Sequence, residues 1–172
     1  MLTYPDGRKY EGSFEDGKRH GQGIEIFEDD HTYEGEFKEG EFDGQGTLTY
    51  PDEQIYKGTF EDGLRHGQGV EIFPDECRYE GAFHEGEFHG QGVLTYPDGR
   101  CYEGPFENGK RQGKGWETFP NGVNTKNYEG QFEDNEFYGH GVLTYPDGTS
   151  FEGLFESTSC CHYLHLILID CV

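Results

Sequence analysis

The chain has 172 residues, of which 31% are hydrophobic and 16% aromatic, and its formal net charge is -22 at pH 7. Disordered chains are poor in aromatic residues, so this composition predicts a folded protein that buries rings rather than aliphatic side chains. The excess of carboxylates repels nucleic acid, whose binding sites are rich in Lys and Arg, and it disfavours bulk attraction to an anionic membrane. We therefore expect no nucleic-acid partner.

A five-residue phrase of the form Tyr-Glu-Gly-x-Phe returns along the chain at steps of 23 residues, with one step of 26. A fixed period of this length indicates a repeat array in which each unit contacts only its neighbours. We expect one array over residues 1–156, of about seven units with the first incomplete. The phrase stands, with small variations, at Tyr10–Phe14, Tyr33–Phe37, Tyr56–Phe60, Tyr79–Phe83, Tyr102–Phe106, Tyr128–Phe132 and Phe151–Phe155.

The unit that begins at Thr32 predicts a β-hairpin. Apolar and glutamate residues alternate in Tyr33–Phe37, which is the mark of a half-buried strand. Gly40 can then adopt the positive φ that a tight hairpin turn needs, and Gly44–Tyr50 forms the second strand. The same turn position is held by Gly17, Gly63, Gly86 and Gly109, and once by Asn135.

Paired glycines in the second strand predict where the aromatic rings lie. Gly44 and Gly46 would weaken a strand unless something packs on the bare backbone, and rings of the adjacent strand are the natural cover. Tyr-Pro-Asp-Gly then turns the chain into the next hairpin. We predict an all-β fold, a single-layer curved antiparallel sheet of stacked hairpins with about 13 strands. The extra residues near Val123–Asn127 are expected to stay in a loop.

This combination of phrase, turn, Gly-x-Gly and Tyr-Pro-Asp-Gly resembles the MORN repeat over almost the whole chain outside the tail. One departure is Phe at the end of the first strand, where many family members have Trp. The resemblance implies a solenoid that serves as a non-enzymatic scaffold for protein partners. Gly17–Gly23 is similar to repeats of ciliary radial spoke head proteins, which implies a ciliary or cytoskeletal assembly.

Arrays of this family also occur in junctophilins and beside the catalytic domains of phosphatidylinositol phosphate kinases and a SET-domain lysine methyltransferase. The resemblance therefore leaves two alternatives: a membrane or phospholipid-associated tether, and a regulatory module of a larger enzyme.

The repeats alternate between two types. In one type the second strand carries a glutamate on the glycine side, at Glu25, Glu71 and Glu117; in the other a leucine stands there, at Leu48, Leu94 and Leu143. Basic residues at one rim alternate with acids in the same rhythm, and we expect them to pair across strands. The basic set is Lys18, Arg19, Arg65, Lys110 and Arg111, and the acidic set is Glu41, Glu87 and Glu136.

We hypothesise that the aromatic face, punctuated by these carboxylates, binds a basic amphipathic segment of a partner protein. The alternative is that the glutamates point to water from a one-layer sheet. The candidate partner-binding residues are Tyr33, Phe37, Tyr56, Phe60, Tyr79, Phe83, Tyr102 and Phe106, with Glu25, Glu71 and Glu117 selecting a basic partner. Ile24, Ile26, Val70, Ile72 and Trp116 fall on the opposite face, as a second interface or as packing against neighbouring turns.

The sequence lacks the common motifs of catalytic and cofactor-binding sites. It contains no phosphate-binding Gly loop, dinucleotide fingerprint or calcium loop, so we expect no enzyme activity, cofactor or metal. The apolar, Cys-rich tail 157–172 breaks the repeat, and its Cys and His residues lack the spacing of a zinc site.

The cysteines and the first residues indicate the cell compartment of the chain, and the open edges of the predicted sheet indicate whether it can self-associate. Its five cysteines do not occupy matching repeat positions, and the first residues do not resemble a signal peptide, so we expect a reducing, cytoplasmic environment. An open sheet also leaves strand edges that can pair, which makes edge-to-edge self-association possible.

Overall fold

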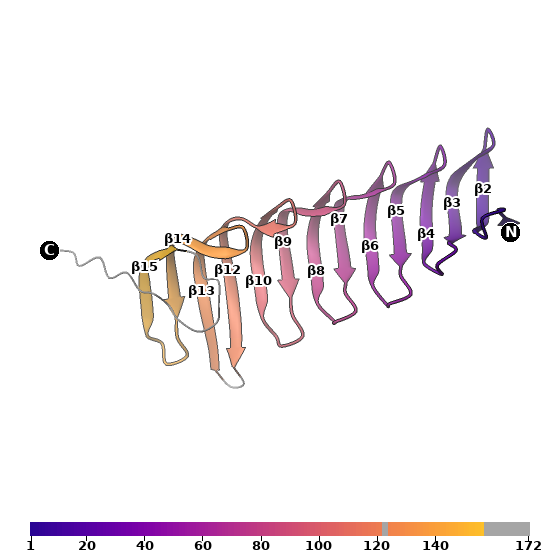
Figure 1. Cartoon of the computed structure of the whole chain (residues 1–172). Helices are drawn as coiled ribbons and strands as arrows, with labels where there is room; N and C mark the ends of the chain where they lie inside the picture. The colour runs from indigo at the N-terminus through magenta and orange to yellow at the C-terminus, as the bar shows by residue number, and fades with distance from the viewer. Residues whose placement is uncertain (122–123, 157–172) are drawn as a thin grey trace.

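The computed structural model, which describes residues 1–121 and 124–156, is a single open sheet of 15 strands. Neighbours in sequence are neighbours in space, and every pair is antiparallel, so the hairpins follow one another along the array (Figure 1). This confirms the predicted all-β, single-layer architecture. The sheet has two strands more than the expected 13, because the short β1 pairs with β2 and because Gln112 separates β11 from β12.

The strands have the following bounds: β1 Leu2–Thr3, β2 Lys9–Glu15, β3 Lys18–Ile26, β4 Thr32–Lys38, β5 Glu41–Thr49, β6 Ile55–Glu61, β7 Leu64–Ile72, β8 Arg78–His84, β9 Glu87–Thr95, β10 Cys101–Glu107, β11 Lys110–Arg111, β12 Gly113–Asn121, β13 Asn124–Glu133, β14 Glu136–Thr144 and β15 Ser150–Glu156.

The tight hairpin turns use positive backbone angles, as the sequence predicts. Asp16 and Gly17 have φ values of 49° and 78°, the pattern of a two-residue turn whose twist matches that of the flanking strands. In the last of these turns Asp134 and Asn135 have φ values of 50° and 74°. Asparagine therefore replaces glycine with the same backbone conformation.

Each complete hairpin packs a tyrosine ring onto two facing glycines. Gly35 and Gly46 lie opposite each other, and the ring of Tyr33 covers both. A Cβ atom on Gly35 would lie 2.5 Å from the Cα of Gly46, and one on Gly46 would lie 2.5 Å from ring atoms of Tyr33. The Tyr33 hydroxyl donates a hydrogen bond to the carbonyl of Glu36 at 2.8 Å. The same arrangement recurs at Tyr10, Tyr56, Tyr79, Tyr102 and Tyr128.

The tyrosines join a continuous ladder of rings that links every hairpin to the next. Tyr33 makes an edge-to-face contact with Phe37 of its own strand and with Phe60 of the following repeat, both with ring centroids 5.1 Å apart. Phe37 in turn contacts Tyr10 of the preceding repeat at 5.1 Å. These contacts make up the core of a sheet that has no second layer.

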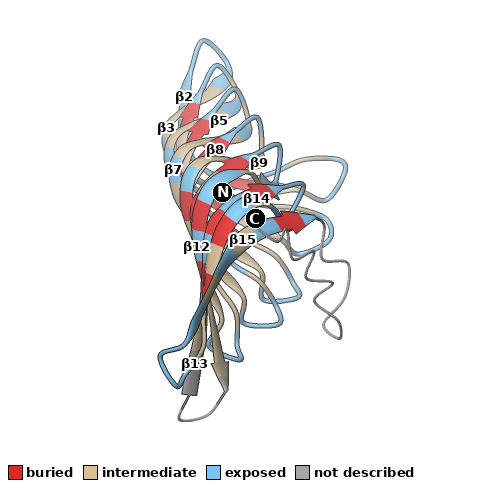
Figure 2. Cartoon of the chain, turned by 90° about the vertical axis from the view of Figure 1, so that its left-hand side faces the viewer, coloured by how far each residue is buried: buried red, intermediate tan, exposed pale blue. Residues whose placement is uncertain are grey.

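The sheet is bent around this ladder, and we call the face that carries the rings the concave face. Seen along the array, buried residues form a band across the middle of the strands, while exposed residues lie towards their ends (Figure 2). A β-bulge between Gly35 and Phe37 shifts the register of β4 against β5, and equivalent shifts occur in four other hairpins. Bulges bend strands, which explains part of the curvature.

The expectation that residues near Val123–Asn127 stay in a loop is wrong. The extra residues lengthen the hairpin instead, because Phe119 pairs with Lys126 and Asn121 with Asn124 in a continued antiparallel ladder. Continuing the ladder satisfies backbone N–H and C=O groups that a wider loop would leave to solvent. The predicted tail 157–172 lies outside the described residues.

Replacing Gly81 by alanine tests the tyrosine–glycine packing. A Cβ at this position would lie 2.6 Å from both the Cα of Gly92 and the hydroxyl of Tyr79. We expect the free energy of unfolding to fall by about 1–3 kcal/mol, the usual cost of overpacking. The matched control is Glu80→Ala in the same strand, where the side chain is exposed. Equal urea-unfolding midpoints for the two variants would contradict this packing.

Candidate functional site: the concave aromatic face

The eight rings predicted to contact a partner lie in the core of the concave face. The four tyrosines of this set are 0% exposed and the four phenylalanines are 2–3% exposed. They offer almost no surface to another molecule, and their direct effect is to hold the hairpins together. Their role in partner binding stays a prediction. The set is Tyr33, Phe37, Tyr56, Phe60, Tyr79, Phe83, Tyr102 and Phe106.

The three glutamates of the predicted site are buried beside arginines. Glu25, Glu71 and Glu117 are 1–3% exposed, so the alternative that they point to water is wrong. Arg111 Nη1 donates to Glu117 Oε2 at 2.7 Å, and the pairs Arg19–Glu25 and Arg65–Glu71 are equivalent.

These ion pairs were not the ones expected from the sequence, which predicts pairing with rim acids such as Glu41. The arginines turn inward to the buried carboxylates instead. Burial raises the pKa of Glu25 and of Glu117, and the adjacent guanidinium acts against this effect. Their selection of a basic partner stays a prediction.

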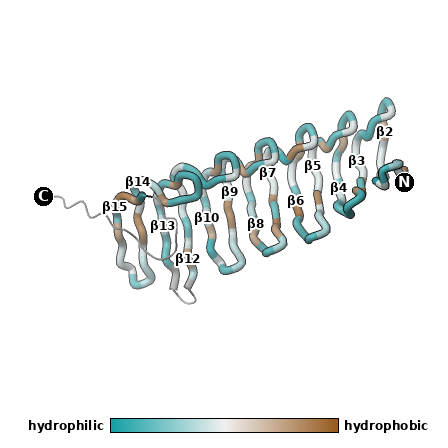
Figure 3. Tube along the Cα trace, viewed as in Figure 1, coloured by the Kyte–Doolittle hydropathy of each residue, from teal (hydrophilic) through white to brown (hydrophobic). Residues whose placement is uncertain are grey.

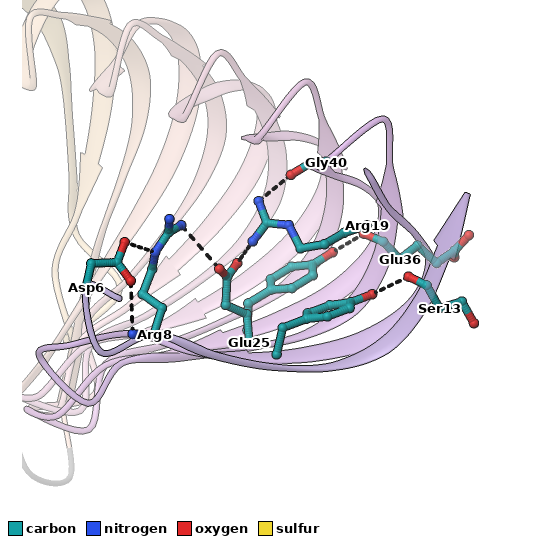
Figure 4. A network of polar contacts seen from close by, with 9 residues as sticks. Asp6, Arg8, Ser13, Arg19, Glu25, Glu36 and Gly40 are labelled. Atoms are coloured by element: carbon teal, nitrogen blue, oxygen red, sulfur yellow. Dashed lines mark hydrogen bonds and ion pairs between the residues drawn. The ribbon is translucent and has the colours of Figure 1, made fainter. Parts of the chain in front are cut away.

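Each arginine also joins its hairpin to the next one. The guanidinium carbon of Arg111 lies 5.3 Å from the ring centroid of Tyr102 and 5.2 Å from that of Phe132. Its other amino group donates to the carbonyl of Asn135. Arg65 repeats the arrangement with a 2.6 Å bond to the carbonyl of Gly86. Figure 4 shows Arg19 and Glu25 inside the bend of the strands, beside two tyrosine rings.

In the alternate repeats a phenylalanine takes the place of the arginine. Phe42 stacks on Tyr33 with ring centroids 3.7 Å apart and an angle of 11° between the planes. Phe88 on Tyr79 and Phe137 on Tyr128 have the same geometry. An Arg–Glu pair therefore alternates with a Phe–Leu pair along the array. The sequence shows this signal, because the two positions, six residues apart, always change together.

Sequence reasoning missed the aromatic side chains that remain partly accessible. Six of them occupy the first position of the longer turns, and Phe119 holds the equivalent place inside the lengthened strand β12. All seven are half-buried, and all except Tyr96 pack against the core. One of these side chains is Tyr96, and the guanidinium carbon of Arg100 lies 4.2 Å from the centroid of its ring. An aromatic residue at every such turn was the available signal. We call this set of half-buried aromatic residues the outer row: Tyr4, Phe27, Tyr50, Phe73, Tyr96, Phe119 and Tyr145.

Six stretches of the chain match the family model of the MORN repeat, at residues 10–32, 33–54, 56–78, 79–99, 102–123 and 128–150. The chain belongs to the MORN-repeat family. The seventh phrase, Phe151–Phe155, lies outside these matches. Membership in this family indicates a protein- or membrane-binding module.

No curated protein matches this MORN chain. One solved structure that resembles it is the TCP domain of SAS-4 (dCPAP) of Drosophila melanogaster, in complex with a proline-rich motif of Ana2 (dSTIL). The sequences are 12% identical, and the match covers 91% of this chain and 84% of that one with a TM-score of 0.45. A likeness this weak supports no inference about function.

Acidic turns border the concave face of the MORN array at both ends of the strands. Glu28 and Asp29 belong to one border, and Glu61 and Asp62 to the other. The loops are accordingly coloured as hydrophilic in Figure 3. A hydrogen bond from the Arg100 amide lowers the pKa of the exposed carboxyl of Asp98, so this border carries charge at neutral pH. The face is thus an aromatic floor between two acidic rims.

Within the described ranges, 1–121 and 124–156, no group of three His, Cys, Asp or Glu side chains is arranged to hold a metal ion. The same part of the MORN chain has no helix that is long and apolar enough to cross a membrane. The metal-ligand question raised by the tail falls outside the described residues.

Exchanging one buried ion pair for its apolar counterpart tests the alternation. Arg65→Phe or Glu71→Leu alone leaves a charged group on the concave face without its partner, and we expect each to lower the free energy of unfolding by about 3–5 kcal/mol. The double variant copies the neighbouring repeats and should lie within about 1 kcal/mol of the original chain. The four proteins form a double-mutant cycle, measured by urea unfolding. Additive effects of the two single changes would refute the coupling.

Proposed function

We propose that this MORN array is a non-enzymatic scaffold that holds a basic amphipathic segment of a partner protein on its concave face. The observation that carries the proposal is the outer row, a series of half-buried aromatic side chains that runs between two acidic rims. Aromatic side chains with one accessible side are frequent anchors at protein interfaces. A segment with an apolar face and flanking Lys or Arg matches this floor and these rims.

In this proposal the buried rings do not contact the partner; they pack against the outer row and hold it in place. Phe73 makes an edge-to-face contact with Phe88, which stacks on Tyr79 of the ring ladder. Glu71 acts in the same indirect way, because it fixes Arg65 over two rings. In this proposal the predicted residues shape the floor, and the outer row and the rims contact the partner.

A membrane tether has less support in the structure. The basic side chains at the rim that could face lipid headgroups are engaged within the chain, as in Lys18 with Glu39 and Lys110 with Asp134. We propose a cytoplasmic location on the ground of the cysteines and the first residues of the sequence, and a ciliary or cytoskeletal assembly on the ground of the resemblance of the repeats alone. The same resemblance allows it to serve beside the catalytic domain of a larger enzyme.

Removing two side chains of the outer row tests the proposal. The double variant Phe73→Ser and Tyr96→Ser should weaken binding of a labelled, basic amphipathic peptide by about tenfold or more, because buried aromatic anchors dominate such interfaces. Fluorescence anisotropy near physiological salt gives the affinity. The matched control is Ile72→Ser, whose side chain lies beside Phe73 but on the opposite face and is 39% exposed. Unchanged affinity in a folded double variant would overturn the concave-face proposal.

Sedimentation with anionic vesicles separates the scaffold from the tether. With a net charge of -22, the chain should stay in the supernatant when it is mixed with phosphatidylserine-containing liposomes at physiological salt. Sedimentation with the vesicles, reversed by added salt, would favour the tether instead.

A further inference from the structure

The face opposite the rings, which we call the convex face, carries a straight row of side chains that crosses the sheet from β2 to β15. The strand register places each member directly opposite the next; for example, Trp116 lies between Glu103 and Glu129. We call this set the convex row: Glu11, Ile24, Glu34, Thr47, Lys57, Val70, Glu80, Val93, Glu103, Trp116, Glu129, Val142 and Glu152.

The convex row alternates charge with apolar surface. Every first strand of a hairpin contributes an exposed glutamate, except for Lys57, and almost every second strand contributes an apolar residue. Ile24 and Trp116 are 42% and 38% exposed, although both are large and hydrophobic. Because the sheet has one layer, no other described element covers this face.

Several of these carboxylates have no basic partner among the described residues. Glu80 pairs with Arg78 at 2.6 Å and Glu129 with Lys114 at 2.9 Å, both at the surface. Glu11, Glu34, Glu103 and Glu152 make no ion pair within the described part of the chain. The face therefore combines uncompensated negative charge with exposed apolar side chains.

This charge decides which molecule fits the face. A second copy of the chain would bring an identical acidic row against the first, and like charges across an interface are unfavourable. Nucleic acid and anionic lipid are repelled for the same reason. The complementary occupant is a basic protein segment with apolar or proline residues between its charges.

The spacing of the acids decides the conformation of that segment. Strands lie about 4.8 Å apart, so acids on every second strand recur at about 9.6 Å. Residues on one side of a polyproline II helix recur every third position, at about 9.3 Å. Residues on one side of a β-strand recur at every second position, about 6.6 Å apart. In an α-helix, residues seven positions apart lie on the same side, about 10.5 Å apart along the axis. The polyproline II conformation fits the row most closely.

We propose that the convex row binds a polyproline II segment that carries Lys or Arg at every third position. The best stretch runs from Glu80 to Glu152, where four acids follow one another without the interruption that Lys57 makes earlier in the row. Glu103 and Glu152 are unpaired, whereas Glu80 and Glu129 are in exposed ion pairs whose Arg78 and Lys114 the basic residues of the segment would replace. Such a site spans about ten residues of the segment. Trp116 stands at its centre, and its partly exposed side chain is a surface on which proline can pack. This second surface does not depend on the concave-face proposal.

The single tryptophan of the chain makes the test direct, since Trp116 fluorescence reports on its own site. The probe is a repeated Pro-Pro-Lys peptide of about 12 residues, compared with a peptide of the same composition whose lysines are clustered at one end. We expect the periodic peptide to change the fluorescence and to bind about tenfold more tightly than the clustered one. Equal affinities would overturn the spacing argument, and absence of binding would overturn the site.

Charge-reversal variants locate the binding. Glu103→Lys with Glu129→Lys should weaken binding of the periodic peptide by about tenfold, whereas Glu11→Lys with Glu34→Lys, the same charge change on the convex face outside this stretch, should weaken it by less than about threefold. Equal losses would show a general charge effect and overturn the site. The Phe73→Ser and Tyr96→Ser variant should bind the periodic peptide normally. This comparison separates a failure of the convex row from a failure of the concave-face scaffold.

Discussion

The structure depends on a tyrosine ring that covers two facing glycines. A single-layer sheet has no second layer against which to bury its side chains, so each hairpin must cover its own backbone. Tyr33 does this by lying over Gly35 and Gly46, in space that a Cβ atom would otherwise fill. Its hydroxyl remains a donor to the backbone, and burial raises the pKa of the equivalent Tyr56 to about 12. The ring ladder and the bend of the sheet follow from this packing.

Alternate repeats place an arginine and a buried glutamate beside this ring ladder, and each of the two charges has a partner. Arg111 contacts a carboxylate, two rings and a carbonyl of the next hairpin, so its charge and several of its donors are used. In the other type, Phe137 and Leu143 occupy the equivalent places and need no polar partner. Buried ion pairs are tolerated when such partners are complete. The two repeat types therefore fill equivalent places on the concave face, one with a satisfied ion pair and the other with apolar side chains.

Local patterns made most of the fold predictable. The 23-residue period, the turn glycines and the Tyr over Gly-x-Gly arrangement each lie within one hairpin, and the structure confirms them. Contacts between hairpins were harder to predict. The edge-to-face contact of Tyr33 with Phe60 joins the rings of two consecutive repeats. The sequence of a single repeat does not indicate this contact. The inward turn of Arg65 to Glu71 was missed because the rim offered other acids. The outer row was missed because its residues look like turn residues.

The alternation has a consequence for how such a gene can change length. Each Arg–Glu hairpin is followed by a Phe–Leu hairpin, and Arg65 reaches the carbonyl of Gly86 in that successor. Duplication or loss of two hairpins, 46 residues or 49 where the longer repeat is included, preserves every such junction. Duplication or loss of one would set two hairpins of the same type side by side, a junction that the described array does not contain. The smallest unit that can be added or removed with every junction preserved is therefore the hairpin pair.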